Sequence, residues 1–578
     1  MSLQRQVGNR IVQRLLTGPS TPRHNTPSAS ALQRFESNEH RHLGDQGTTN
    51  AQGQAATMEL APGYFISFGE MTAMAGDFFR SVDEMKRLAS NTNIHGAGTR
   101  EEIEYVRQVK VAGKSNLESS FSAEARSAVD QRYYELAGNN SSHFTEPRGQ
   151  TERTSANNRG NYRDNHEQAI RMGVAAGAAK GPINDALLYE AFASHYLTDS
   201  YSAGHMRTER ISIVDWWNPR VPMFWTNLKL FIAERLAYYI NDHTTIAGGL
   251  QSVDALWETV RETIDQKRLP TLTFGDLISG ACHDYDNEKG VDSQHGVLLG
   301  DGQLMSQDGS NSLLPAGQHT AERAIEAVRT SRTELDRAYE LGGSGSTPEQ
   351  VIAQLMTDGS YAAEKLWPQA LPDAQQTPDR AEPNWKKNTI EELLADPVIQ
   401  EAIRIFSAEK AATLESALTF EDVKKMGITL VSASVQSQGF KEGLTDRLRS
   451  NPIPLMQEII NYTPKTGGGV GGHNTDDNAS EYIGMARQTP NGLASLTVTQ
   501  GVNLIRDLIG GVCDDDDEAT ILDLVRSMDN TKMRQVVLAL GGGDAQAGID
   551  FLDSGVDGEE WSTLTTLLRR EPELAKLL

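Results

Sequence analysis

The sequence contains very little cysteine and no long apolar run. Its 578 residues include only 2 cysteines, Cys282 and Cys513, which lie far apart in the chain. A disulfide-stabilised scaffold is therefore excluded, and we expect both thiols to be reduced core residues. No apolar stretch is long enough to cross a bilayer, so we expect no stable transmembrane insertion.

Motifs of several common enzyme classes are also absent. The chain has no glycine-rich phosphate loop, no zinc-ribbon cysteines and no Gly-x-Ser-x-Gly nucleophile elbow. Long regular alternation of apolar and polar residues is missing as well, so the β content should be minor. We therefore expect a mainly α protein, with a central helical domain followed by a helical C-terminal region.

The composition is that of a globular protein with a strongly acidic balance. Hydrophobic residues make up 38% and charged residues 23% of the chain, and the net charge is −24. This acidity disfavours tight, nonspecific binding to nucleic-acid backbones or anionic membranes. It does not exclude a nuclease, because bound divalent cations reverse the local charge.

Breaks in the apolar pattern predict the order of the domains. We expect an amphipathic helix, a linker rich in small and polar residues, a metal-binding helical domain, a further helical region, a glycine-rich linker and a small helical bundle. These segments span residues 1–17, 18–59, 60–345, 346–465, 466–478 and 479–578, respectively. In the last segment, Asp514–Asp517 are expected to cap a helix at its N-terminus.

The most informative stretch is Ala186–Arg207, which begins as an apolar helix. His195 and Asp199 are one turn apart on that helix, so an imidazole and a carboxylate share a face and can hold one zinc-like ion. His205 can join them only if the chain turns after Asp199, because a straight helix would carry it roughly 15 Å further. The alternative is a core histidine, a capping aspartate and a surface histidine.

A second string lies upstream, His143-Phe144-Thr145-Glu146-Pro147. Together with His195-Tyr196-Leu197-Thr198-Asp199 and the following His205, it resembles the zinc-dependent phospholipase C and fungal-type single-strand nuclease superfamily. The resemblance implies a phosphodiester hydrolase with two or three zinc ions. It also implies that His143, His195, Asp199 and His205 are ligands. We consider Glu146 and Asp199 as the catalytic carboxylates.

The resemblance implies further ligands that the sequence places less firmly. Asp77, in a helix expected over 63–90, would be the aspartate ahead of the HF string, or else a polar residue at a helix end. His40 would be the early histidine, or part of a solvated stretch. The family's later His-x-x-x-Glu pair is missing, so we consider His283 and Asp284, or else a solvated acidic loop. His166 is expected to be a capping or surface residue.

The N-terminal residues 1–17 lack the features of a secretory signal. Leu3-Gln4-Arg5, Gly8-Asn9-Arg10, Val12 and Leu15-Leu16 resemble a segment of proteins encoded with extracellular contractile injection systems. The resemblance implies a protein made in the bacterial cytoplasm, loaded into the tube lumen or against the baseplate of an injection particle, and delivered to a target cell.

Two functions fit these observations. We favour a metal-dependent hydrolase that acts on phospholipid or nucleic acid as a toxin carried by the particle. The alternative is a non-catalytic cargo or structural component of the particle that keeps a relic metal site. In the resembled family one metal also binds the free amino end of the mature chain, a role that Met1 does not fill without processing. This missing ligand and the incomplete second pair favour the alternative, whereas the ligand-type residues that remain in register favour the enzyme.

Overall fold

The computed structural model describes residues 37–93, 95–138, 140–146, 157–231, 273–300, 302–306, 312–417, 445–464, 475–510 and 513–578. Its secondary structure is mainly α-helical, which confirms the predicted fold class. Among these residues, β structure is limited to two antiparallel pairs. They are β1 (Thr57–Ala61) with β2 (Tyr64–Ser67), and β3 (Val291–Ser293) with β4 (Gly296–Leu298). The helix predicted over 1–17 lies outside the described residues.

The chain divides into two compact units. The central unit falls within Gly18–Ile213 and Asp276–Thr413, and the C-terminal unit takes in Val214–Gly275 and Leu414–Leu578. The described residues 214–231 therefore leave the central unit, although they lie within the predicted domain 60–345. A prediction made along the sequence assumes continuous domains and misses this arrangement.

The central unit is built from helices of very different length. Its α-helices are α2 (Ser37–Gly47), α3 (Phe68–Met74), α4 (Val82–Ser90), α5 (Arg100–Tyr105), α6 (Ala123–Gly138), α7 (Asn158–Ala179), α8 (Asn184–Asp199), α9 (Ala203–Arg207), α13 (Phe274–Lys289), α14 (Gln318–Gly343), α15 (Pro348–Thr357), α16 (Ala362–Lys365), α17 (Ile390–Ala395) and α18 (Pro397–Ala417). A π-helix, η1 (Val106–Val111), and short 3-10 turns η2 (Ser115–Ser120), η3 (Asn140–His143), η4 (Asp373–Gln375) and η5 (Pro378–Arg380) connect them. Helix α10 (Arg210–Trp217) crosses the boundary between the units.

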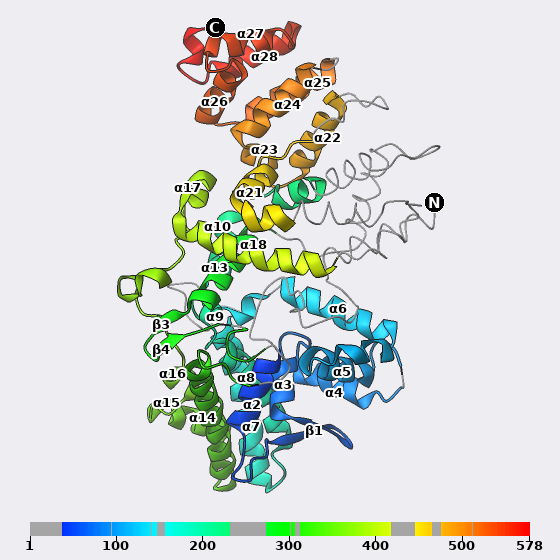
Figure 1. Ribbon diagram of the computed structural model, residues 1–578, viewed down its shortest axis with the longest axis vertical. Coiled ribbons are helices and arrows are strands. Elements are labelled where there is room, and N and C mark those ends of the chain that lie inside the picture. Colours follow the sequence, from blue (N-terminus) through cyan, green and yellow to red (C-terminus); the bar gives the residue numbers. More distant parts are fainter. Residues whose placement is uncertain are drawn as a thin grey trace. The chain divides into compact units, whose positions relative to one another are not determined.

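Helix α8 forms the centre of this unit. Nearly every side chain from Ala186 to Asp199 is buried. Helices α2, α3, α7 and α14 pack against it (Figure 1). A helix that is covered on all sides carries its polar residues into the core, where they need partners. The polar residues of α8 are therefore the place to look for a site.

Two local predictions are wrong. Residues 37–47 and 57–61 form α2 and β1 inside the predicted linker 18–59. The sequence of α2 is polar, but Glu39, His40 and Leu43 are buried, so contacts across the fold hold it. The helix expected over 63–90 is broken, because Ser67 starts α3 with a capping box and Gly76 has a positive φ.

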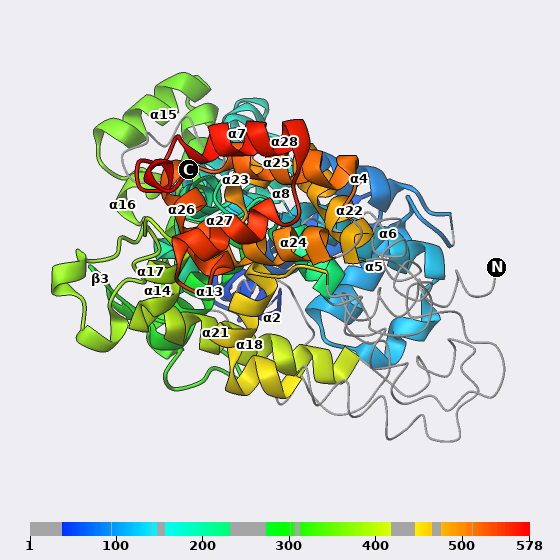
Figure 2. The ribbon, with the colours of Figure 1, turned by 90° about the horizontal axis from the view of Figure 1, so that it is seen from above.

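The C-terminal unit contains short helices that pack against one another, with α24 in contact with α22, α25 and α26 (Figures 1 and 2). They are α21 (Pro452–Ile460), α22 (Thr475–Gln488), α23 (Gly492–Ser495), α24 (Val498–Gly510), α25 (Asp515–Ser527), α26 (Asn530–Leu540), α27 (Ala545–Asp553), α28 (Gly558–Leu568) and the turn η6 (Leu574–Lys576). Asp514 caps α25 in a capping box with Asp517, which confirms the predicted capping role. No helix in the described ranges is long and apolar enough to cross a membrane.

Candidate metal centre

Helix α8 carries two of the predicted ligands into the core. His195 and Asp199 are one helical turn apart, and both side chains are fully buried. The helix ends at Asp199, and after a turn the short helix α9 begins at Ala203. This turn, which the sequence predicts, brings His205 Nδ1 to 3.2 Å from Asp199 Oδ1.

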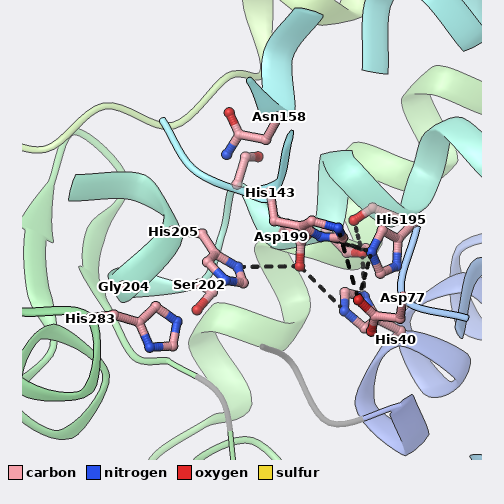
Figure 3. A network of polar contacts seen from close by, with 12 residues as sticks. His40, Asp77, His143, Asn158, His195, Asp199, Ser202, Gly204, His205 and His283 are labelled. Atoms are coloured by element: carbon pink, nitrogen blue, oxygen red, sulfur yellow. Dashed lines mark hydrogen bonds and ion pairs between the residues drawn. The ribbon is translucent and has the colours of Figure 1, made fainter. Parts of the chain in front are cut away.

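Asp199 lies among four imidazoles (Figure 3). Its Oδ2 atom is 2.6 Å from His143 Nδ1 and 3.5 Å from His195 Nε2. Its Oδ1 atom is 3.3 Å from His40 Nε2 and 3.2 Å from His205 Nδ1, yet neither contact has hydrogen-bond geometry. Ligands about 2.1 Å from a tetrahedral zinc ion lie roughly 3.4 Å from one another. The spacing around Oδ1 is therefore that of atoms sharing a cation.

Asp77 reaches the same cluster from the loop after α3. Its Oδ1 atom is 3.7 Å from His195 Nε2 and 3.9 Å from His143 Nε2. The preceding Gly76 has φ +68°, and a Cβ there would lie 2.8 Å from both His143 Cε1 and His195 Cδ2. Only glycine lets the loop approach the two imidazoles this closely.

The hydrogen bonds of His195 fix which of its ring nitrogens faces the cluster. Its Nδ1 lies 3.0 Å from the carbonyl oxygen of Thr72, which can only accept, so Nδ1 carries the proton and donates. The lone pair is then on Nε2, which lies 3.1 Å from His143 Nδ1 and also faces Asp77 and Asp199. A backbone carbonyl that orients an imidazole in this way is the usual outer support of a histidine ligand.

His40 comes from α2, where a buried glutamate anchors the helix. The carboxylate of Glu39 accepts hydrogen bonds from the backbone amides of Gly302, Leu304 and Met305 at 3.0–3.1 Å. This directs the next residue, His40, toward Thr198 and Asp199 on α8. The early histidine of the cluster thus sits on a helix that the sequence does not predict.

The donor set fits a divalent metal ion. Two overlapping groups each have ligand atoms within 4.8 Å of one another, His40/His195/Asp199 and Asp77/His143/His195. Nitrogen and carboxylate ligands of this kind suit zinc. Burial alone would raise the pKa of Asp199, but the imidazoles of His195, His205 and His143 outweigh burial and hold that pKa well below its usual range. Asp199 is therefore a carboxylate, ready to bind a cation.

His283 lies beside the cluster rather than in it. Its ring centroid is 4.8 Å from that of His205, and it is fully buried on α13. One turn later on α13, Asn287 Oδ1 accepts hydrogen bonds from the backbone N of Gly204 at 2.7 Å and from Ser202 Oγ at 3.1 Å. His283 and Asn287 have the spacing of the His-x-x-x-Glu pair of the resembled family, with a carboxamide in place of the acid.

Asp284 and Glu146 belong to neither ligand group among the described residues. Asp284 Oδ1 is 2.9 Å from His283 Nδ1. Burial and the charge of Asp284 raise the pKa of Glu409, on α18, to about 7. Glu146 is half-buried at the end of the described segment 140–146. The roles assigned to Asp284 and Glu146 stay predictions.

Sequence reasoning missed the residues that support the ligands. Thr198 and the carbonyl of Thr72 orient imidazoles, and they carry no sequence signal because many hydroxyls and every carbonyl could do so. Glu39 binds three backbone amides, and its position beside His40 in the sequence does not reveal that role. Asn287 does have a signal, its one-turn spacing from His283, which a search for acids alone overlooks.

A second buried charged group lies elsewhere on α8. His166 Nδ1 is 2.7 Å from Glu190 Oε2, and its Nε2 is 2.9 Å from Glu334 Oε2. Burial alone would lower the pKa of His166, but the two carboxylates outweigh burial and raise that pKa to about 10. The prediction of a capping or surface role for His166 is wrong, because α14 covers it with a carboxylate from a distant part of the sequence.

Comparisons with protein-family models, with curated proteins and with solved structures found no match to this chain.

Proposed function

We propose that the protein is a metal-dependent phosphodiester hydrolase. The observation that carries this proposal is the buried cluster of His40, Asp77, His143, His195 and Asp199, whose acceptor atoms converge. His143 Nδ1 hydrogen-bonds to Asp199 Oδ2, but the Asp77 carboxylate and the lone pair of His195 Nε2 also face each other in this buried site, and a cation between them would offset their repulsion. The two sequence strings that resemble zinc phospholipases C and single-strand nucleases give the reaction class.

The residues divide into two overlapping sets. His40, His195 and Asp199 would hold one zinc ion, and Asp77, His143 and His195 would hold another, with His205 beside Asp199. Zinc supplies Lewis-acid polarisation of a phosphoryl oxygen and lowers the pKa of a bound water toward neutrality. The chain itself contributes fixed ligands and outer support, and Glu146 is our candidate acceptor for a proton.

Phospholipid and nucleic acid are both phosphodiesters, so both belong to the proposed substrate class. We further propose that the protein is made in the bacterial cytoplasm and acts as an effector cargo of a contractile injection particle. The motif in residues 1–17, which lies outside the described residues, supports this. Deleting residues 1–17 should abolish loading into particles, and unchanged loading would exclude the packaging role.

One observation favours a second candidate function, a particle component with a relic metal site. Asn287 follows His283 at the spacing of the acid in the resembled family's His-x-x-x-Glu pair, and its carboxamide accepts hydrogen bonds from Gly204 and Ser202. A neutral amide binds a divalent cation more weakly than a carboxylate does. An ion at His205 and His283 would therefore be the first to be lost.

Hydrolysis assays separate the two candidates. The zinc-loaded protein is incubated with phosphatidylcholine vesicles, single-stranded DNA and RNA, with and without a chelator. We expect cleavage of at least one substrate, its loss with the chelator, its return with zinc, and no cleavage by Asp199→Asn. A zinc-loaded protein that cleaves none of the three would contradict the hydrolase and leave the relic-site candidate.

A further inference from the structure

Thr198 makes a contact that decides the chemistry of His40. Its Oγ1 atom lies 2.8 Å from His40 Nδ1, and both side chains are fully buried. The Thr198 hydroxyl also lies 2.9 Å from the backbone carbonyl oxygens of Ser194 and His195. Figure 3 shows the result of this arrangement, with the His40 ring facing Asp199.

The single proton of the Thr198 hydroxyl fixes the direction of these bonds. Carbonyl oxygens only accept, so the hydroxyl proton is directed to the helix backbone. Toward His40, the hydroxyl oxygen can then only accept, which requires the proton of a neutral His40 ring to be on Nδ1. The lone pair of His40 is consequently on Nε2, 3.3 Å from Asp199 Oδ1.

The other tautomer of His40 would close the site. With its proton on Nε2, the ring would have no lone pair on the side of Asp199 to offer to a cation. A buried Nδ1 without a proton would then face a hydroxyl oxygen that has no proton left to donate. The bond lost at Nδ1 favours the tautomer whose Nε2 can bind a cation.

We infer that Thr198 is a positioning residue that selects the metal-binding tautomer of His40. Through it, the His40/His195/Asp199 group becomes a metal site that can be weakened without weakening the Asp77/His143/His195 group. This inference rests on the metal centre of the proposed function. It assigns a role to a residue that does not itself contact the ion.

The test replaces Thr198 in the full-length chain. Thr198→Val has nearly the same shape but no hydroxyl, whereas Thr198→Ser keeps the hydroxyl. Ser194→Ala is the matched control, because Ser194 is a buried hydroxyl on α8 whose Oγ donates only to the carbonyl of Glu190 among the described contacts. Each variant is titrated with zinc against a chromophoric chelator, and metal-free melting temperatures are recorded alongside.

We expect Thr198→Val to bind one zinc ion about 10- to 100-fold more weakly, as is usual for loss of an outer hydrogen bond to a histidine ligand. The affinity for the other ion should stay close to that of the wild type, and the metal-free melting temperature should fall only slightly, because the buried His40 Nδ1 loses one partner. Thr198→Ser should restore the lost affinity, and Ser194→Ala should bind zinc as the wild type does.

Three results would overturn the inference. The first is wild-type affinity for every ion in Thr198→Val, which would leave the proposed function intact. The second is a sign of a general structural effect. It would be a loss of zinc affinity in Thr198→Ser equal to that in Thr198→Val, or a loss of affinity for all ions together with a markedly lower metal-free melting temperature. The third is a wild-type protein that binds no zinc, which would overturn both this inference and the proposed metal-dependent hydrolase.

Discussion

At the scale of single residues, the contacts of Asp199 are the main reason to expect a metal ion. Asp199 contacts four imidazoles from α2, η3, α8 and α9, and its two oxygens face different groups. Burying a charged group costs free energy unless the group is paired, so carboxylates are rare in protein cores. The persistence of such a group in the core is the residue-level argument for a bound cation.

Gly76 provides a prediction at this scale. Gly76→Ala should destabilise the protein by at least about 2 kcal/mol, because alanine is strained at this φ and its Cβ would overlap His143 and His195. It should also weaken zinc binding, because Asp77 would move away from both imidazoles. Denaturant unfolding and zinc titration measure the two effects.

Gly63→Ala is the control for that variant. Gly63 has φ +72°, close to that of Gly76, but a Cβ there meets nothing within 4 Å. Gly63→Ala should lower the free energy of unfolding only through backbone strain, and it should leave zinc binding unchanged. Equal effects of the two substitutions on zinc binding would contradict the role given to Gly76.

The same residues show what the sequence could predict about the site. The strings around His143 and His195 bring in four ligand-type residues because their spacing is fixed by local structure. The family resemblance adds Asp77 and His40 as candidates. In the structure these two residues lie in one cluster with the four from the strings. Thr198, Glu39 and Asn287 were missed because their roles depend on partners far away in sequence, which spacing along one chain segment does not reveal.

At the scale of elements, α8 connects two buried polar groups. Glu190 near its middle pairs with His166 of α7, and Glu334 of α14 completes the group. Tyr162 and Tyr361 pack on the His166 ring, and Ser331 hydrogen-bonds to both Tyr162 and Glu190. Such a buried ion group contributes orientation more than stability. We interpret it as the contact that sets how α7, α8 and α14 are aligned.

The raised pKa of His166 gives a pH prediction. His166 titrates near 6.5 when unfolded and at about 10 in the fold. A raised histidine pKa stabilises the fold fully below the unfolded value, and this stabilisation is lost as pH rises through about 10. The free energy of unfolding of the metal-free protein should therefore fall between pH 7 and pH 10.5 by an amount on the order of a few kcal/mol.

His166→Gln tests that prediction. It should be less stable than the wild type at pH 7 by about 3–5 kcal/mol, because two buried carboxylates lose their cation. The gap between the two proteins should narrow at alkaline pH, where the wild-type imidazole is neutral. A gap that stays constant across this range, measured by denaturant unfolding, would show that His166 is not charged in the fold.

At the scale of the whole molecule, each unit is assembled from segments that are separated in sequence. In the C-terminal unit, the segment 214–231 meets α21, α22 and α24 through buried polar groups. Tyr482 donates from its hydroxyl to Asn227 Oδ1 at 2.6 Å, and Asn227 Nδ2 donates to the carbonyl of Ile460 at 3.1 Å. Gln500 Nε2 completes the network by donating to the Tyr482 hydroxyl at 2.8 Å. The helical class was predictable from local pattern, but this arrangement was not.

Tyr482→Phe tests that the segments form one unit. Removing the hydroxyl leaves the buried Asn227 Oδ1 and Gln500 Nε2 each short of a partner, so we expect a loss of about 1–3 kcal/mol. Tyr339→Phe is the control. The Tyr339 hydroxyl donates a longer hydrogen bond, 3.2 Å, to the carbonyl oxygen of Gly181, and this bond is only part-buried. Hydrogen exchange should show faster opening of residues 214–231 in Tyr482→Phe. Unchanged exchange there would contradict a shared unit.

The most direct test of the central claim is the metal content of the purified full-length protein. Elemental analysis is made on the wild type and on the double variant His195→Ala/Asp199→Ala, both prepared with zinc and then dialysed. We expect zinc bound to the wild type, approaching two ions per chain if both ligand groups fill, and little or none in the variant. A folded wild type that retains no zinc would contradict the claim.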